Sequence, residues 1–473
     1  MSSDWPLKEL VLIADEVTVG YVGPMATEYV ESGIPFLRSL NIDQFNINSN
    51  DLKYVTPEFH HRIKKSSLHP GDVAIVRTGK PGTCAVIPDW LQDANCSDLV
   101  IVRCGREIRP HFLCYWVNSK ATHHIESHTV GAVQQHFNVG AAKTMKVAVP
   151  SLHKQDQVLE LLRGLDDRIT LLRETNTTLE AIAQTLFKSW FVDFDPVRAK
   201  QEGREPEGMD AATAALFPSE FEDSELGYTP SVGRVSPTGV TRQIRDEVSD
   251  GNVGLRCANP TYRLGLVPKG WRPVPFTDTV YVIGGGTPKT SMTEYWNGDI
   301  PWFSVVDAPT ITDVFVIDTQ KHITEKGLNN SSTKLLAKGT TIISARGTIG
   351  RLALVGRQMA MNQSCYGLRG KADDDYFTYF STCRLVESLK QRSHGSVFDT
   401  ITMATMTGVF IIYPDKAVIR AFETLLQPVM DRIQKNLEQA QTLATLRDTL
   451  LPRLISGQLR LPDAEPILET ANA

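Results

Sequence analysis

Two stretches of the chain carry apolar residues at a spacing of seven. The first runs from Val158 to Trp190 and the second from Phe422 to Leu454. Such a heptad stripe is typical of a helix that packs along a partner helix. Each stripe contains one asparagine, Asn176 or Asn436, and a polar residue in a helical seam can fix the register at a cost in stability. The pattern therefore predicts two long helices.

Each of these helices could pack on its own globular domain or on a partner helix. Because the stripes persist over several heptads, we favour pairing of the two helices with each other. An antiparallel coiled coil would place one globular domain at each end. The residues expected to hold this spacer are Leu165, Leu172, Leu179, Val429, Ile433 and Leu443.

Gly164 and Pro428 occupy the same position in the two stretches. Both residue types disfavour helix interiors, and proline is well tolerated in a first turn. We therefore expect a short helix, a break, and a long helix that starts near residue 165 or 429. The long helix would cover about 26 residues, or roughly 40 Å at about 1.5 Å per residue.

The helical stretches belong to an internal repeat that spans most of the chain. GIPFLRSLNI from Gly33 matches DIPWFSVVDA from Asp299, and HPGDVAIVRTGKPG from His69 matches AKGTTIISARGTIG from Ala337. Trp5 and Trp271 also correspond, and the offset stays between 264 and 268 residues. A period of this length indicates a duplicated domain and not a solenoid of stacked units.

Each half of the repeat combines a globular part with a helical part. The globular parts contain short β-branched runs that end in glycine, such as residues 72–79 and 340–347, which predicts strands that enter turns. The fold class is therefore mixed α/β (α+β) with a pseudo-twofold repeat. The predicted boundaries are 1–150 and 267–414 for the globular domains, 151–192 and 415–458 for the helical regions, 193–266 for a linker, and 459–473 for a tail. The linker is polar, with helical turns expected only near Ala211–Leu216.

Composition indicates a soluble protein of the cytoplasm. The net charge is -5, so a nucleic-acid-binding role would need partners to supply part of the attraction for phosphates. Seven cysteines at irregular spacing do not resemble a disulfide framework, and we expect reduced thiols. No apolar run is long enough to cross a bilayer, and the N-terminus lacks the layout of a secretory signal.

No stretch of the sequence supplies a convincing active site. Residues 259–262 (Asn-Pro-Thr-Tyr) resemble the N-P-P-[YF] motif of amino-methyltransferases, but Thr261 replaces a proline and no glycine-rich strand precedes it. The glycines at 284–286 lack the spacing of phosphate-binding loops, which favours a structural turn. The pairs His60–His61 and His123–His124 would face opposite ways on a strand and are poor candidates for metal ligands. A chain of this length without such a site favours a binding protein.

The chain resembles the DNA-specificity (S) subunit of type I restriction–modification systems over nearly its whole length. The motifs that carry this resemblance are LFKSWFVDFDPVRAKQEGREPEGMD from Leu186, ALFPSEFEDSELG, GGTP at Gly285–Pro288, IPWFS at Ile300–Ser304, GTIGRLALV at Gly347–Val355 and LRDTLLPRLISGQLRL near the end. Residues 228–263 have no counterpart in this resemblance.

The resemblance implies two target-recognition domains and an antiparallel spacer that docks two modification subunits. Those partners would bind S-adenosylmethionine and methylate a flipped adenine, and restriction subunits would use ATP and Mg for translocation and cleavage. No cofactor is expected in this chain, which would be a non-catalytic subunit.

Two unlike domains on a spacer near 40 Å imply an asymmetric bipartite DNA site, because one DNA turn is about 34–36 Å. Arg, Lys, Asn and Gln side chains read base edges, and phosphate contacts position a protein. The candidate contacts lie in strand-end loops: Arg77, Thr78, Lys80, Lys289, Arg346 and Thr348. Solvated surface side chains are the alternative for each of them. A self-sufficient DNA methyltransferase or nuclease, or an interaction scaffold without a DNA role, are the alternatives for the whole chain.

Overall fold

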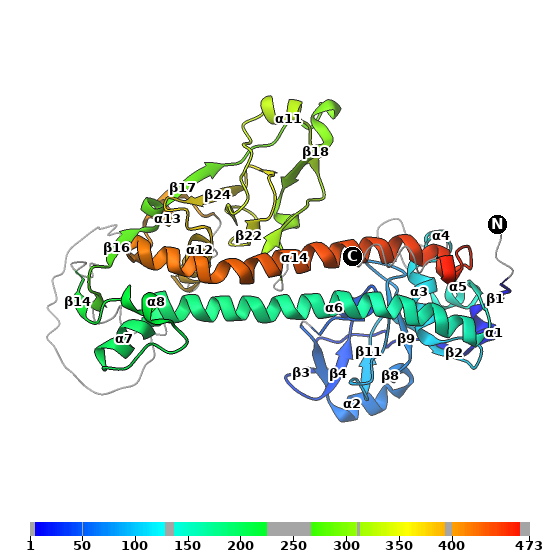
Figure 1. The fold of residues 1–473 in the computed structure, drawn as a ribbon. Coiled ribbons are helices and arrows are strands. Elements are labelled where there is room, and N and C mark those ends of the chain that lie inside the picture. Colours follow the sequence, from blue (N-terminus) through cyan, green and yellow to red (C-terminus); the bar gives the residue numbers. More distant parts are fainter. Residues whose placement is uncertain are drawn as a thin grey trace, which may run out of the picture. The chain divides into compact units, whose positions relative to one another are not determined.

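The computed structural model describes residues 5–49, 51–127, 137–224, 266–309, 313–392 and 400–463. The chain forms two compact units, and unit 1 joins segments from the two ends of the sequence. Unit 1 comprises Met1–Thr170 and Ala440–Ala473, and unit 2 comprises Leu171–Gln439. Figure 1 colours the elements of both units along the sequence.

Unit 1 is built around a four-stranded antiparallel sheet with the strand order β10-β9-β12-β2. Its strands are β2 (Ala14–Val19), β9 (Val73–Val76), β10 (Cys84–Val86) and β12 (Leu99–Cys104). Val73 and Ile75 pack in one core with the helix α3 (Pro110–Lys120), whereas Ala74 and Val76 belong to a second core. The two cores alternate along β9 because successive side chains of a strand point to opposite faces. The predicted strand is thus buried on both faces.

The second core of unit 1 joins this sheet to a five-stranded sheet with the order β3-β7-β4-β11-β8. Its strands are β3 (Tyr29–Val30), β4 (Ile34–Leu37), β7 (Lys53–Val55), β8 (Ser67–Leu68) and β11 (Ala94–Cys96). The globular domain of unit 1 also contains β1 (Leu7–Glu9), α1 (Leu10–Ile13), β5 (Ile42–Asp43), β6 (Asn46–Ile47), α2 (Pro57–Arg62), α4 (Thr122–Ser127), α5 (Val139–Lys143), β13 (Lys146–Ala148) and 3-10 turns at Ser39–Asn41 and Lys64–Ser66.

Unit 2 contains a five-stranded sheet with the order β17-β24-β21-β22-β19 and a three-stranded sheet with the order β20-β18-β23. The strands of the first are β17 (Val280–Gly284), β19 (Phe315–Val316), β21 (Thr341–Ser344), β22 (Leu352–Val355) and β24 (Cys365–Gly370). Those of the second are β18 (Trp296–Phe303), β20 (His322–Ile323) and β23 (Ala360–Met361). Further elements are β15 (Leu266–Pro268), β16 (Arg272–Pro275), α10 (Phe276–Thr279), α11 (Glu325–Asn329), α12 (Asp375–Arg392), α13 (Met403–Thr407), β25 (Phe410–Tyr413) and 3-10 turns at Thr293–Tyr295 and Val305–Asp307.

The sheets confirm the duplication that the sequence predicts. The order β22-β21-β24-β17 in unit 2 repeats the order β10-β9-β12-β2 in unit 1. The turns after β9 and β21 also match, because Gly79 and Gly347 both have positive φ, of 89° and 76°. A backbone N–H donates across each turn at 3.0 Å, from Gly82 to Val76 and from Gly350 to Ser344. The same hydrogen-bonded turn therefore closes the equivalent hairpin in both units.

The two long helices are continuous, so the predicted breaks at Gly164 and Pro428 are wrong. The helix α6 (Leu152–Lys188) has 37 residues and α14 (Lys416–Ile455) has 40. At about 1.5 Å per residue they are roughly 55 and 60 Å long. Glycine and proline cost about 1 and 3 kcal/mol in a helix interior. Gly164 and Pro428 both lie on exposed faces, and the buried residues on either side of them hold the helix together.

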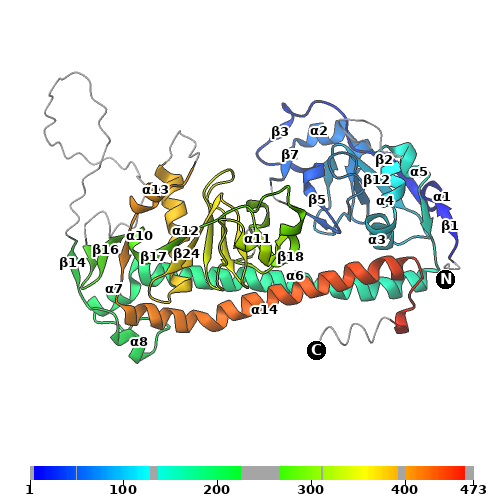
Figure 2. The same cartoon turned by 90° about the horizontal axis from the view of Figure 1, so that it is seen from above.

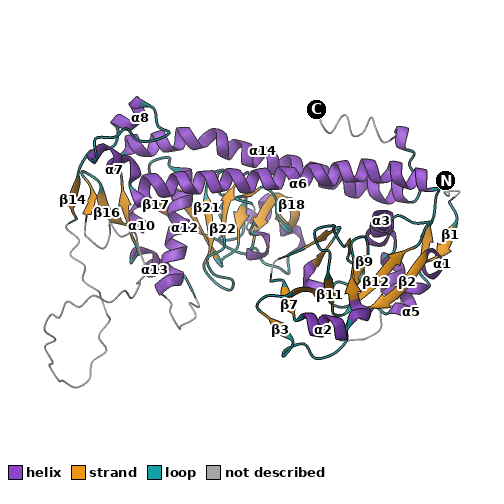
Figure 3. Ribbon diagram, turned by 90° about the horizontal axis from the view of Figure 1, so that it is seen from below, coloured by secondary structure: helices purple, strands orange, loops and turns teal. Residues whose placement is uncertain are grey.

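Within each unit the two helices run antiparallel to each other. In unit 2, Asn176 contacts Asn436 while Phe187, further along α6, contacts Phe422, earlier on α14. In unit 1, residues 158–162 pack with residues 450–455, and Asp166 pairs with the earlier Arg447. The helices appear in purple in Figure 3. Of the six predicted spacer residues, four are buried and two are half-buried: Leu165, Leu172, Ile433 and Leu443 in the first group, Leu179 and Val429 in the second.

The two asparagines of the predicted seam meet in unit 2. The amide nitrogen Nδ2 of Asn436 donates to Oδ1 of Asn176 at 2.9 Å, and Nδ2 of Asn176 donates to the carbonyl of Ile433 at 3.1 Å. Both side chains are buried, at 2% and 1% exposure. Any shift of one helix along the other would leave these amides without partners, so the pair favours a single register.

We expect Asn176→Leu or Asn436→Leu alone to lower the free energy of unfolding by about 1–3 kcal/mol, because each leaves the buried amide of the other asparagine unsatisfied. The double variant Asn176→Leu/Asn436→Leu should be more stable than either single variant, since both amides are replaced by apolar seam residues. Urea unfolding of the four proteins gives the coupling free energy. Additive effects of the two substitutions would contradict the pairing.

The segment after α6 is folded, which corrects the predicted linker over its first part. A π-helical turn (Ser189–Asp193) continues into α7 (Asp195–Gln201), α8 (Ala211–Ala215) and β14 (Phe221–Asp223), which pairs with β15. Trp190, Phe194 and Phe217 are buried there, and Phe194 and Phe217 contact Trp271 at the start of the second repeat. This segment is part of the core of unit 2. Residues 225–265 and 464–473, the rest of the predicted linker and most of the tail, lie outside the described residues.

A polar network joins the globular domain of unit 1 to both long helices. Nη1 of Arg447 in α14 donates to Oδ1 of Asp166 in α6 at 2.7 Å, and the hydroxyl of Tyr115 in α3 donates to the other carboxylate oxygen. The guanidinium of Arg447 also lies 5.0 Å from the ring centre of Phe45. Arg447 is a charged residue within the apolar seam. Through these contacts it links α14 to α6, α3 and the β5–β6 hairpin.

In unit 2 a buried carboxyl of α14 holds the start of α12. Glu423 accepts backbone hydrogen bonds from Tyr376 at 3.1 Å and from Phe377 at 2.8 Å. Burial raises the pKa of Glu423 to about 8. The first N–H groups of a helix lack partners within the helix, so this contact fixes the globular domain of unit 2 to the long helix.

Candidate nucleic-acid interface

In unit 1 three loops meet at one edge of the four-stranded sheet. The strands β2 and β9 end at this edge and β12 begins there, because β12 is antiparallel to both neighbours. The backbone N–H of Gly20 donates to Leu99, and that of Tyr21 donates to Cys96, both at 2.8 Å. The antiparallel topology therefore brings residues 20–21, 77–83 and 96–98 together.

Two of the three candidate contacts in unit 1 hold these loops in place. Arg77 donates to Oδ1 of Asp98 at 2.9 Å and to the carbonyl of Phe137 at 3.2 Å, and its side chain is only 15% exposed. The hydroxyl of Thr78 donates to Oδ2 of Asp98 at 2.6 Å. Lys80 is exposed on the turn. Among the three, Lys80 is the side chain best placed to meet a ligand.

The same edge recurs in unit 2. The strands β17 and β21 end there and β24 begins there. The backbone N–H of Gly286 donates to Met361 at 2.9 Å, and that of Ala345 donates to Ser364 at 2.8 Å. Residues 284–290, 345–351 and 361–364 thus form one edge. It carries all three candidates of this unit, and Lys289, Arg346 and Thr348 are exposed.

The glycines at 285 and 286 serve close packing, as the sequence predicts for a structural turn. A Cβ on Gly285 would lie 1.9 Å from the carbonyl oxygen of Asn362, and one on Gly286 would lie 2.4 Å from the backbone nitrogen of Thr333. Only a residue without a side chain fits at such distances. The tight fit places Thr287 beside Gln363, to which its hydroxyl donates a hydrogen bond.

Sequence reasoning missed the residues that precede strands at these edges. They are Asp98, which precedes β12, and Asn362 and Gln363, which precede β24. The prediction considered only loops that follow strands, yet antiparallel pairing places the start of one strand beside the end of its neighbour. Asp, Asn and Gln side chains directly before an apolar strand were the available signal.

These edges have the chemistry that reading of base pairs requires. Amide, guanidinium and ammonium groups donate to the acceptors of base edges and phosphates. The two edges differ in side chains, because Thr78, Lys80 and Asp98 of unit 1 stand where unit 2 has other residues, with Arg346 and Thr348 in the equivalent turn. The same backbone would therefore present two different patterns of donors and acceptors.

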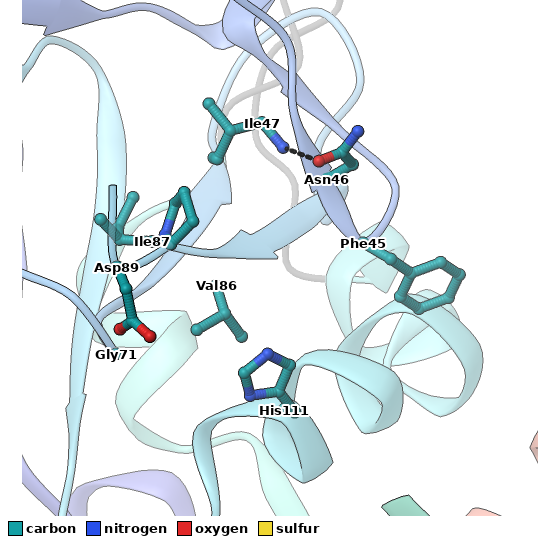
Figure 4. Close-up of a pocket in the computed structure, with 9 residues that line it drawn as sticks. Phe45, Asn46, Ile47, Gly71, Val86, Ile87, Asp89 and His111 are labelled. Carbon is teal, nitrogen blue, oxygen red and sulfur yellow. Dashed lines mark hydrogen bonds between the residues drawn. The ribbon is translucent and has the colours of Figure 1, made fainter. Parts of the chain in front are cut away.

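A cavity of about 320 Å³ in unit 1 lies away from this edge. It is lined by the β5–β6 hairpin, by the end of β10 and the residues after it, which include Asp89, and by His111 at the start of α3 (Figure 4). Burial, with a contribution from the charge of Arg163, lowers the pKa of His111 to about 4. Gly71, at the start of β9, also lines the cavity, which places it at the opposite end of the sheet from Arg77.

The described residues bring His, Cys, Asp and Glu side chains together only in small groups. Among those residues, no group of three or more His, Cys, Asp or Glu side chains could hold a metal ion. His60 and His61 lie in α2, and His123 and His124 lie in α4, so the expectation of strands there is wrong. Residues 259–262 lie outside the described residues. None of the described helices combines the length and apolar character needed to cross a bilayer.

Comparison with known proteins finds similar sequences among the specificity subunits of type I restriction enzymes. Residues 268–445 match the model of the type I restriction modification DNA specificity domain. The chain is 29% identical over 331 residues to the type I restriction enzyme HindI specificity subunit of Haemophilus influenzae, covering 67% of this chain and 70% of that protein. It is 31% identical over 183 residues to the MjaIX specificity subunit of Methanocaldococcus jannaschii, covering 38% of this chain and 42% of that one.

Among solved structures, the type I restriction–modification S subunit from M. genitalium matches with a TM-score of 0.48 at 11% identity, covering 95% of this chain and 96% of that chain. The matched domain lies in the second repeat, and the first repeat has the same sheet topology. The second repeat therefore matches the DNA specificity domain of type I restriction–modification systems, and the chain is similar to a specificity subunit of those systems over 67% of its length.

Proposed function

We propose that this subunit recognises DNA with its two repeated domains, each of which reads one half of an asymmetric bipartite site. The observation that carries this proposal is the recurrence of one strand-end edge, on the same sheet topology, with different side chains. A duplicated scaffold supplies the same docking geometry twice, and the differing side chains select different bases. The two half-sites should therefore differ in sequence.

The long helices are the proposed determinant of the gap between the half-sites. Each helix is continuous across the boundary between the two units, at residues 170–171 in α6 and 439–440 in α14. A continuous helix is stiff compared with a flexible linker. The buried asparagine pair favours one register of the helices, and a single register would give a single gap length.

The proposed partners are two modification subunits and the restriction subunits of a type I complex. The seam residues are buried, so docking would use the outer faces of α6 and α14. Those faces in unit 2 carry the exposed apolar residues Leu171, Ile182 and Leu425. S-adenosylmethionine would be bound by the modification subunits, and ATP and Mg by the restriction subunits.

Methylome sequencing of cells with and without this gene tests the proposal. We expect one asymmetric, bipartite adenine-methylation motif to disappear when the gene is deleted, because no other subunit would supply the sequence recognition. Replacing residues 1–150 by the corresponding domain of a related specificity subunit should change one half of the motif and leave the other. The proposal would be contradicted if every methylation motif persisted after the deletion, or if the motif that disappeared had no gap.

A further inference from the structure

A strongly basic surface in unit 1 lies outside the residues that the sequence singled out. The helix α2 and the 3-10 turn that follows it (residues 57–66) carry His61, Arg62, Lys64 and Lys65 at exposed positions. Glu58 is the one acidic residue of this segment. The positive charge contrasts with the net charge of -5 for the whole chain. We call residues 57–66 the basic segment.

The basic segment is held rigidly by contacts of its apolar and small polar residues. The hydroxyl of Thr56 accepts a hydrogen bond from the backbone of Phe59 at 3.2 Å and caps α2. Phe59 is 3% exposed and packs edge-on against Tyr21, with ring centres 5.5 Å apart. After the helix, the hydroxyl of Ser66 is buried and donates to Asn95 at 2.6 Å. The lysines therefore project from an ordered backbone.

These contacts also place the basic segment beside the strand-end edge of unit 1. Tyr21, which packs on Phe59, belongs to that edge, because its carbonyl accepts from Asp98 at 3.3 Å. The helix α2 lies on the side of the unit 1 sheets remote from α6 (Figures 1 and 2). Arg62 is engaged by Glu28 at 3.0 Å and lies 4.7 Å from the ring centre of Phe59. Lys64 and Lys65 remain as exposed cations next to the edge.

The fold does not require positive charge at this position. The equivalent element of unit 2 is α11, which is also capped by a threonine, Thr324, and follows the equivalent strand. Its sequence is Glu-Lys-Gly-Leu-Asn, and Lys326 is neutralised by Glu294 at 2.8 Å. The same structural element is thus basic in one repeat and close to neutral in the other. A structural role shared by both repeats cannot explain Lys64 and Lys65.

We propose that Lys64 and Lys65 bind phosphates of the DNA at the half-site read by the first domain. This inference rests on the proposed function and adds a sequence-independent anchor beside the reading edge. A cation that neutralises a phosphate releases condensed counterions, so its contribution depends on salt and not on base sequence. In a chain with net negative charge, the part of this attraction that partner subunits do not supply has to come from local basic clusters.

The test is the double substitution Lys64→Gln/Lys65→Gln in the complete complex with its modification subunits. Binding would be measured on DNA that carries the methylome-derived motif, over a range of salt concentrations. The slope of the logarithm of the DNA association constant against the logarithm of the salt concentration should become less negative by about two. The affinity should fall on the order of tenfold to a hundredfold near 0.1 M salt. The bases of the methylated motif should stay the same.

Lys143→Gln/Lys146→Gln is the matched control. These two exposed lysines belong to the same unit and remove the same charge. Lys146 pairs with Glu9 in the β1–β13 ladder, which adjoins the start of β2 and not the residues, such as Tyr21, that follow its end. The salt slope of the control should match that of the unmodified complex.

An unchanged salt slope in the Lys64→Gln/Lys65→Gln complex would overturn the inference while leaving the proposed function intact. A change in which bases are methylated would also overturn it, because the lysines would then be reading bases. If the unmodified complex showed no preference for its motif over random DNA, the proposed function itself would fail.

Discussion

Replacing Phe422 with alanine should lower the free energy of unfolding of unit 2 by about 3–5 kcal/mol, the usual cost of removing a large ring from a packed core. Phe422 is fully buried in α14. Its ring centre lies 4.9 Å from that of Phe191, 5.7 Å from that of Trp190 and 5.8 Å from that of Phe187. The cavity would open where the end of α6 packs on α14.

This cluster also links the helices to the recognition domain of unit 2. Phe187 and Phe191 both contact Phe377 of α12, and Phe191 contacts Trp271 near the start of the second repeat. The loss at Phe422 should therefore loosen the helix pair and the domain together. Denaturant unfolding followed by tryptophan fluorescence measures it, because Trp190 and Trp271 lie within the cluster.

Leu425→Ala is the matched control for Phe422→Ala. Leu425 lies one turn further along α14 and is 46% exposed. Its truncation should change the free energy of unfolding by no more than about 0.5 kcal/mol. Similar losses for both variants would show that the cluster does not stabilise this unit in the way that its packing indicates.

A second large effect is expected from lengthening both helices of the spacer. Inserting four helix-forming residues between Thr170 and Leu171, and four between Gln439 and Ala440, should widen the gap of the recognised site and keep both half-sites. Four residues add about 6 Å to a helix and slightly more than one turn. That length corresponds to about one or two base pairs of DNA. Both insertions fall at the boundary between the units and leave the segments that carry the buried asparagine pair intact.

The readout of this experiment is the methylation motif in cells that carry the lengthened gene. Inserting the four residues in α6 alone is the control, because the seam of one helix would then slip against the other, and modification should be lost. A four-residue insertion shifts the phase of a heptad only locally, so the double insertion should preserve pairing. An unchanged gap after the double insertion would rule out the helices as its determinant.

The sequence by itself determined the elements that depend on local patterns. The heptad stripes identified both long helices and the burial of their seam, because a helix repeats its faces every 3.6 residues whatever surrounds it. The internal repeat identified two equivalent domains, since related sequences form the same hydrogen-bonded hairpins, as the turns at Gly79 and Gly347 do. The β-branched runs at residues 72–79 and 340–347 predicted the strands β9 and β21.

Only the tertiary structure determined the features in which contacts with residues far away in the sequence override a local preference. Pro428 stays inside a helix because packing of the neighbouring seam residues outweighs its local cost. Arg77, a candidate contact by its place after a strand, is held by Asp98, which is 21 residues away and is brought close by strand pairing. The sequence after position 193 is polar and predicts a linker, but its first part folds because Phe194 and Phe217 pack against Trp271. Local propensities amount to about a kcal/mol per residue, and the burial of several large side chains against distant partners exceeds them.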